Sequence, residues 1–309
     1  MDLEAARFSE RMAAPFVYKS LSEDTRRAYN SAIRDFFLFV NMLHPRDIQP
    51  AHVLAWRDHL ISRGRKPSTV ATKLSIIRSF FDYLLTGGAI HANPAATKLV
   101  PPPLVGDGHA GRALSKKEVR QLLCGPDRRT ADGARDYALL LVMLRLSLRV
   151  VEVTRLRRSS VKWNGQWIVK CKVKGGREEV WPVPADVKQA IDAYLELDSG
   201  RRATVKSDGP EAFLFQPQTN YRTLVFDKGL SRRHVERIVA RWADYANIGK
   251  VTPHDLRRTV VTRLLEDGHS YRDVQRVTKH RDPKTVMRYD KQRENLMNNP
   301  INSLSYDGD

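Results

Sequence analysis

Apolar residues recur at helical spacing along most of this chain, and the pattern predicts a mainly α-helical protein. In the segment SEDTRRAYNSAIRDFFLFV, Ile33 and Phe36 share one face, and Ser22 is the expected N-cap. A second helix should begin at Pro50. The segment KPSTVATKLSIIRSFFDYLLTGG predicts a third helix that ends at Gly87. The first third is therefore expected to be a small helical domain.

A linker is expected after this domain. The stretch VPPPLVGDGHAG contains three prolines, which stiffen a chain, and three glycines, which free it. We therefore predict a first domain at 1–99, a linker at 100–111 and a second domain at 112–309, with a C-terminal tail from about 292.

The pattern changes within the second domain. Ser115 and Glu118 have the spacing of a capping box ahead of an apolar helix, and a longer helix should break near Ser147. In VKCKVK, valine and cysteine alternate with lysine, which is typical of a half-buried strand, and the pairs NG and GG flank it as turns. The remainder is again helical. The predicted fold class is mainly α with a small antiparallel β-sheet.

The charge of the chain indicates a polyanionic partner. The net charge is +18, and both predicted domains contain more lysine and arginine than acidic residues. A hinge between two basic domains would allow both to close around double-stranded DNA. Lys66, Lys73 and Arg78 are candidate phosphate contacts in the first domain, and a solvated helix face is the alternative interpretation.

The two cysteines, Cys124 and Cys171, are too few for a disulfide framework or a zinc site, and both are expected to be buried thiols in a reducing compartment. The acidic N-terminus lacks the apolar run of a signal peptide. No apolar stretch approaches the roughly 18 residues of a membrane span. We expect a cytosolic or nucleoid-associated protein.

The candidate chemistry lies in the C-terminal third, at His254, Arg257, His280 and Tyr289. The chain contains four His-x-x-Arg pairs, so this spacing alone carries little information. The pair at 254 differs because Thr-Pro precedes it and a histidine and a tyrosine follow it. Arginines hold an anionic phosphate, imidazoles move protons and a phenol attacks, so the group suits a phosphodiester.

Further candidates lie upstream, where SLRVVE supplies Arg149 and Glu152 and KVKGGREE supplies Lys174. Simpler interpretations exist for individual residues. Arg149 could cap a helix or pair with Glu152, Lys174 could be a solvated strand lysine, His280 could lie at the surface and Tyr289 could pack in the core. The combination and the order of the residues favour a reaction centre.

In this order the segments resemble the tyrosine recombinases, also called the phage integrase family. The family's T-G-L-R-x-x-E, hairpin-lysine, H-x-L-R, L-G-H and tyrosine boxes read SLRVVE, VKGGREEVWPVP, HDLR, TKH and MRYDK here. The resemblance covers nearly the whole chain, and the helical first third resembles the core-binding domain of that family.

This chain departs from the family boxes at three places. Ser147-Leu148 stands for the Thr-Gly pair before the first arginine, and Lys279 stands for the glycine before the last histidine. In the hairpin box, Arg177 is followed by two glutamates. Lys172 is therefore an alternative to Lys174.

The resemblance implies a role for each candidate. Tyr289 would attack the phosphorus, with the attacking phenolate stabilised by fixed cations because free tyrosine ionises only near pH 10. The other implied roles are oxygen clamps for Arg149 and Arg257, base or proton shuttle for His254, donor to a phosphate oxygen for His280, acid on the 5′ oxygen for Lys174, and orientation of an arginine for Glu152. The product would be a 3′-phosphotyrosine, formed without ATP, metal or other cofactor.

The resemblance also implies partners. Site-specific recombination requires two duplexes bearing a specific site and four protomers, hence a homotetramer on DNA, with a possible accessory protein or partner recombinase. The tail would pack on a neighbouring protomer, and a disordered terminus is the alternative interpretation. The predicted function is a recombinase of a mobile element. The alternatives are a Xer-type dimer resolvase, a type IB topoisomerase and a non-catalytic DNA-binding regulator of the same fold.

Overall fold

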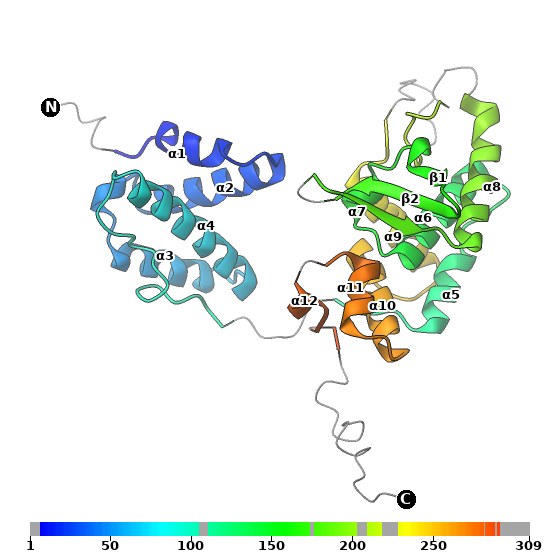
Figure 1. The fold of residues 1–309 in the computed structure, drawn as a ribbon. Helices are drawn as coiled ribbons and strands as arrows, with labels where there is room; N and C mark the ends of the chain where they lie inside the picture. Colours follow the sequence, from blue (N-terminus) through cyan, green and yellow to red (C-terminus); the bar gives the residue numbers. More distant parts are fainter. Residues whose placement is uncertain are drawn as a thin grey trace, which may run out of the picture. The chain divides into compact units, whose positions relative to one another are not determined.

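The computed structural model describes residues 7–104, 111–173, 176–202, 209–217, 228–280, 282–287 and 289–290 (Figure 1). The chain divides into two compact units, Met1–Gly108 and His109–Asp309, and each has its own hydrophobic core. Three predicted features lie outside the described residues. They are half of the linker, at 105–110, the candidate acid Lys174 and the C-terminal tail.

The first unit is helical. Its elements are α1 (Glu10–Tyr18), α2 (Glu23–Phe39), the 3-10 turn η1 (Pro45–Asp47), α3 (Pro50–Ser62) and α4 (Pro67–Thr86). Ser22 caps α2 by accepting a hydrogen bond from the backbone N–H of Thr25, and Pro50 begins α3, as the sequence predicts. Gly87 is the C-cap of α4.

Aromatic side chains fill the core of this unit. Phe36 contacts the rings of Phe37, Trp56 and Phe81 edge to face, and Phe8 stacks on Phe37 with the ring centroids 3.6 Å apart. Edge-to-face pairs add to the gain from burying large apolar rings. The helices of this small unit are therefore joined through one aromatic cluster.

The second unit combines helices with a small sheet. Its helical elements are α5 (Lys116–Cys124), α6 (Ala131–Leu146), α7 (Val150–Val153), η2 (Arg158–Ser160), α8 (Ala185–Arg202), α9 (Arg232–Tyr245), α10 (Pro253–Glu266), α11 (Tyr271–Thr278) and α12 (Pro283–Met287). The antiparallel strands β1 (Val161–Trp163), β2 (Trp167–Lys172) and β3 (Glu178–Pro182) follow one another in space.

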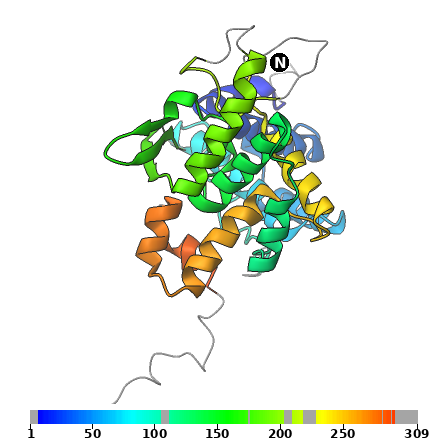
Figure 2. The same ribbon diagram turned by 90° about the vertical axis from the view of Figure 1, so that its right-hand side faces the viewer.

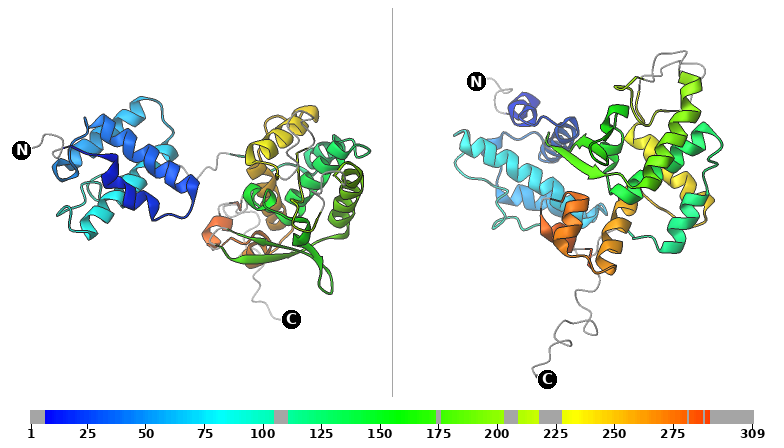
Figure 3. Two further views of the ribbon diagram at one scale, coloured as in Figure 1. Left: turned by 90° about the horizontal axis from the view of Figure 1, so that it is seen from above. Right: turned by 45° about the vertical axis from the view of Figure 1, so that its right-hand side comes forward.

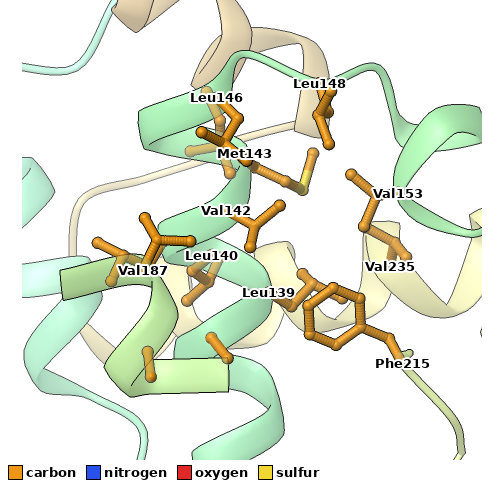
Figure 4. Close-up of a cluster of buried hydrophobic side chains, with 14 of the residues drawn as sticks. Leu139, Leu140, Val142, Met143, Leu146, Leu148, Val153, Val187, Phe215 and Val235 are labelled. Carbon is orange, nitrogen blue, oxygen red and sulfur yellow. The ribbon is translucent and has the colours of Figure 1, made fainter. Parts of the chain in front are cut away.

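Helix α6 lies at the centre of the second core. Figure 4 shows its apolar side chains among Val153 of α7, Val187 of α8 and Val235 of α9. Helix α8 packs along α6, as the side view in Figure 2 also shows. In Figure 3, α11 lies beside the ribbon of β2 and β3, where the indole N–H of Trp181 donates to the carbonyl of Val277 at 2.7 Å.

The predicted fold class, mainly α with a small antiparallel sheet, is confirmed. Within the sheet, alternate residues of β2 face the core, since Val169 and Cys171 are buried and Lys172 is exposed. Burial among apolar groups, beside Glu152, raises the pKa of the Cys171 thiol to about 12. The prediction for Cys124 was wrong, because this cysteine ends α5 and is exposed.

Candidate active site

The start of α10 presents two candidate residues, His254 and Arg257. Thr252 is the N-cap, and its hydroxyl accepts from the backbone N–H of Asp255 while the Asp255 carboxylate accepts from the N–H of Thr252. Pro253 at the first helical position needs no N–H partner there. This local sequence fixes the helix start, so that His254 is exposed while Arg257, one turn later, is buried.

Arg257 joins three segments that are distant in the sequence. Its terminal nitrogens donate to the backbone carbonyls of Ser147 and Thr278, and Nη2 lies 3.1 Å from Nε2 of His280. Burial, and then the nearby positive charge of Arg149, lower the pKa of Arg257 to about 10. Arg257 is still a cation at neutral pH. Among the described residues these bonds use three of its five N–H groups.

Both carbonyls that hold Arg257 lie at helix C-termini closed by a left-handed residue. Ser147 caps α6 with φ +54°, and Lys279 caps α11 with φ +54°. This conformation costs a non-glycine residue roughly 1–2 kcal/mol. The sequence analysis placed the glycine of the first family motif at Leu148. The structure shows that Ser147 is the residue with the backbone that favours glycine. Each of the two left-handed positions holds a side chain where the family box has glycine.

His280 is held as a neutral ring. The hydroxyl of Thr278 donates to the carbonyl of Val274 and accepts from Nδ1 of His280, each at 2.8 Å. The hydrogen-bond network therefore assigns the proton to Nδ1 and a lone pair to Nε2, which faces Arg257. Burial, followed by the charges of Arg257 and Arg149, lowers the pKa of His280 to about 3.

Tyr289 combines a packed ring with a hydroxyl beside the site. The residue is 8% exposed and its ring packs with Val261, Val274 and Val286. Its hydroxyl lies 3.5 Å from Nε2 of His254, and its ring stacks on that of His280 with centroids 6.4 Å apart and planes 24° apart. The apolar contacts thus hold the ring so that its hydroxyl is directed toward His254.

Arg149 and Glu152 form a close pair at the start of α7. Glu152 is buried; one carboxylate oxygen accepts from the backbone N–H of Arg149 at 2.7 Å and the other from Nη1 at 2.9 Å. The pairing that the simpler interpretation of Arg149 expected is therefore present. It also orients the guanidinium, whose charge lowers the pKa values of both Arg257 and His280.

The hairpin lysines are placed only in part. Lys174 lies outside the described residues. Lys172 is exposed at the end of β2, directly opposite Glu178 of β3, so it lies on the outer face of the sheet. The structure thus brings together His254, Arg257, His280 and Tyr289. Arg149 is near enough that its charge lowers the pKa of Arg257 and of His280.

The candidate DNA contacts of the first unit do not form one cluster. Lys66 is exposed at the start of α4, whereas Lys73 pairs with Asp35. Arg78 donates to the carbonyls of Ala95 at 2.9 Å and of Val100 at 3.3 Å. Five residues on a helix turn the side chain by about 140°, so Lys73 and Arg78 point to different sides.

The sequence analysis did not predict Thr278 and Trp181, which contact His280 and the end of α11. Thr278 sets the tautomer of His280, and Trp181 fixes β3 against the end of α11. A signal for Thr278 was available, since a buried hydroxyl two residues before a candidate histidine is a natural partner for its Nδ1. No local signal marks Trp181, because its partner lies 96 residues away.

Comparison with known proteins identifies the family. Residues 112–295 match the Phage integrase family, and residues 7–87 match the phage integrase N-terminal SAM-like domain. The tyrosine recombinase XerC of Thermodesulfovibrio yellowstonii is 30% identical over 276 residues, covering 88% of this chain and 86% of that protein. The tyrosine recombinase XerD of Halalkalibacterium halodurans is 28% identical over 287 residues, covering 88% of each.

Solved structures share the fold. Lambda integrase(75–356), crystallised as a dimer bound to a COC' core site, has a TM-score of 0.69 at 14% identity, covering 93% of this chain and 95% of that one. XerH recombinase bound to a palindromic difH substrate has a TM-score of 0.67 at 17% identity, covering 87% of this chain and 77% of that one.

This chain belongs to the phage integrase family. It is a site-specific tyrosine recombinase, an enzyme that cuts and rejoins DNA, as the sequence resemblance predicted. The described part of the chain contains no helix long and apolar enough to span a membrane.

Proposed function

We propose that Tyr289 is the nucleophile of this recombinase and that His254, Arg257, His280 and Arg149 serve it as the sequence suggested. The observation that carries the proposal is the position of the Tyr289 hydroxyl, 3.5 Å from a ring nitrogen of His254. That distance is at the long end of a hydrogen bond. Such contacts are often loose before substrate binds.

In the proposed step, the phenolic oxygen of Tyr289 attacks the phosphorus as the bond to the 5′ oxygen breaks. His254 accepts the phenolic proton, and Lys174 donates a proton to the departing 5′ oxygen. The products are a 3′-phosphotyrosine and a free 5′-hydroxyl. Since one phosphodiester replaces another, a 5′-hydroxyl from a second strand can reverse the step and complete the exchange.

Arg257 and His280 would change roles when the phosphate arrives. In the free protein, neutral His280 accepts from Arg257 through Nε2. A phosphate anion offsets the charges of Arg257 and Arg149 that lower the pKa of His280, so this pKa should rise on binding. A protonated His280 could then donate to a phosphate oxygen. Arg257 and Arg149 would hold the charge of the pentacoordinate state.

The substrate is double-stranded DNA, and we propose that the enzyme acts on it in the cytoplasm as a homotetramer on two duplexes, with a partner recombinase as the alternative composition of that complex. The net charge of +18 supports phosphate contacts along much of the chain. Lys66 is the candidate contact of the first unit that remains solvent-exposed. Lys73 and Arg78 already have partners within the chain and would have to exchange them to reach DNA.

For the biological role we propose recombination of a mobile element, and resolution of chromosome or plasmid dimers is the second candidate. The relatives named XerC and XerD, which match over most of their length, favour the second. Adducts trapped in the source cell and sequenced at the covalent end distinguish the two. Ends that flank one mobile segment support the first, and a single chromosomal or plasmid site supports the second.

The mechanism itself is tested on a nicked duplex that carries the mapped site. Attack next to the nick releases a short fragment, so the phosphotyrosine accumulates and appears on a denaturing gel. Wild-type protein should form this adduct in excess chelator. If cleavage strictly needs a divalent metal ion, or if the adduct forms at another residue, the proposal is wrong.

A further inference from the structure

Lys279 has contacts that a glycine at this position could not make. Its Nζ lies 3.5 Å from a carboxylate oxygen of Glu179 and 5.5 Å from the centroid of the Trp181 ring. Each of the two charged side chains is 23% exposed. The backbone of Lys279 is left-handed, which is unfavourable for any residue with a side chain. This chain therefore keeps a strained lysine at the residue before His280.

The partners of Lys279 both lie on the inner face of β3. Glu179 is opposite Cys171 of β2, and Trp181, two residues further, is almost fully buried. The indole N–H of Trp181 donates to the carbonyl of Val277 at 2.7 Å. A hydrogen bond, an ion pair and a cation–π contact thus join β3 to the three residues that precede His280. We call Glu179, Trp181 and Lys279 the clasp.

The clasp lies close to the turn of the hairpin. Strand β2 ends at Lys172, opposite Glu178, so the pair of Cys171 and Glu179 is the next one inward. Both candidate acids, Lys172 and Lys174, follow within three residues of that pair.

The clasp also touches the other side of the site. Thr278 lies between Val277 and Lys279; its carbonyl accepts from Arg257, and its hydroxyl accepts from Nδ1 of His280. The clasp therefore holds β3 against the segment whose carbonyl binds Arg257. A partly exposed ion pair adds little to stability, so the main effect of these contacts should be on geometry.

We propose that Lys279 is a positioning residue which, through Glu179 and Trp181, sets where the hairpin acid stands relative to the scissile phosphate. This inference rests on the proposed function. It predicts that loss of the clasp impairs protonation of the 5′ oxygen while leaving attack by Tyr289 largely intact.

The test compares two nicked duplexes carrying the mapped site, one with the normal 5′ oxygen and one with sulfur in its place, which leaves without an acid. Lys279→Met keeps an unbranched side chain, one atom shorter than that of lysine, but removes its charge. It should slow cleavage of the oxygen duplex on the order of tenfold and leave the sulfur duplex unchanged. Glu179→Gln should behave alike, the double variant should be no slower than either, and Lys279→Arg should restore the rate.

Arg276→Met is the matched control, since Arg276 is an exposed cation on the same helix that pairs with Asp273. It should cleave both duplexes normally. An equal loss on both duplexes in Lys279→Met, or no loss on either, overturns the inference. If wild-type protein forms no adduct at all, the proposed function fails instead.

A second measurement needs no activity. Amide hydrogen exchange on the full-length protein should speed up in β3 and at 277–280 in Lys279→Met, and not in Arg276→Met. Unchanged exchange in both segments would show that the clasp does not hold the hairpin, whatever the outcome with DNA.

Discussion

The hydroxyl of Tyr289 lies 3.5 Å from Nε2 of His254, across 35 residues of sequence. The ring packs in the apolar cluster of α10, α11 and α12. Removal of the ring would lower the free energy of unfolding, whereas loss of the hydroxyl alone would not. We therefore expect Tyr289→Phe to keep its fold and DNA affinity and to lose covalent adduct formation, measured on the nicked duplex.

Tyr271→Phe is the control for this change. Tyr271 belongs to the same cluster, and its hydroxyl donates to Asp290 at 2.6 Å. The variant should still form the adduct. An adduct in Tyr289→Phe would mean that another tyrosine attacks, with Tyr271 the first to examine and Tyr306, outside the described residues, the second.

Replacement of Arg257 by lysine should be severe. One ammonium cannot reach two carbonyls and His280 and also hold two phosphate oxygens. We expect Arg257→Lys to raise the cleavage barrier by about 2–4 kcal/mol, by comparison with the loss of one oxyanion donor. Single-turnover cleavage rates measure this. Arg263→Lys, on the same helix, should cleave normally. Near-normal cleavage by Arg257→Lys would place Arg257 outside the reaction.

The pKa of His280 predicts a pH dependence of stability. It is lowered from 6.5 to about 3 in the folded protein, so between these values the unfolded chain binds a proton that the folded chain does not. The stability gained by keeping His280 neutral is fully present above pH 6.5 and is lost as the pH falls toward 3. His280→Gln should lose less stability on acidification, by up to about 1.4 kcal/mol per pH unit.

Urea unfolding of the second unit at several pH values measures this difference. His91→Gln, a change at an exposed histidine of the first unit, should have the wild-type slope. Parallel slopes for wild type and His280→Gln would indicate that His280 is not held neutral.

Lys174→Ala should cleave the oxygen duplex slowly and the sulfur duplex at the wild-type rate, because sulfur leaves without a proton. Lys172→Ala is the comparison, since Lys172 lies two residues away on the outer face of β2. If Lys174→Ala is equally slow on both duplexes, Lys174 binds DNA. Rescue by sulfur in Lys172→Ala instead would make Lys172 the acid.

Ser147 combines two unfavourable features, a left-handed backbone and a buried hydroxyl with no hydrogen-bond partner among the described residues. Ser147→Gly removes both and should stabilise the second unit by about 1 kcal/mol. Ser147→Ala removes only the hydroxyl and should gain less, and Ser147→Val should destabilise. Thermal unfolding of the three variants gives the comparison, and destabilisation by glycine would show that the backbone is not strained.

Local features of the fold were predictable from the sequence. Helix starts at Ser22 and Ser115 depend on residues three positions away, and the hairpin turn depends on Asn164-Gly165. Long-range use of a side chain was not predictable. Nothing near Arg78 indicates that it binds the carbonyls of Ala95 and Val100, and the exposure of Cys124 depends on which side of α5 meets the core.

For the site, the family sequence motifs identified the candidate residues, but they did not predict the burial or the charged neighbours of these residues. Arg257 lies 110 residues from Ser147 and 21 from Thr278, so their meeting is a property of the folded chain. The low pKa of His280 follows first from burial and then from the charges of Arg257 and Arg149, and all of these require the folded chain. Spacing in the sequence could not reveal it, because a lone histidine has no charge neighbours until the chain has folded.

The two carbonyls that bind Arg257 make the position of this arginine depend on the integrity of two helices. A helix end carries partial negative charge, and here two such ends, those of α6 and α11, converge on one guanidinium. Fraying of either helix releases the arginine and so removes one of the charges that, after burial, lower the pKa of His280. If Tyr289 and Arg257 act as we propose, a domain in which either helix end is unfolded would contain the tyrosine without its phosphate-binding arginine, and cleavage would be confined to the fully folded enzyme.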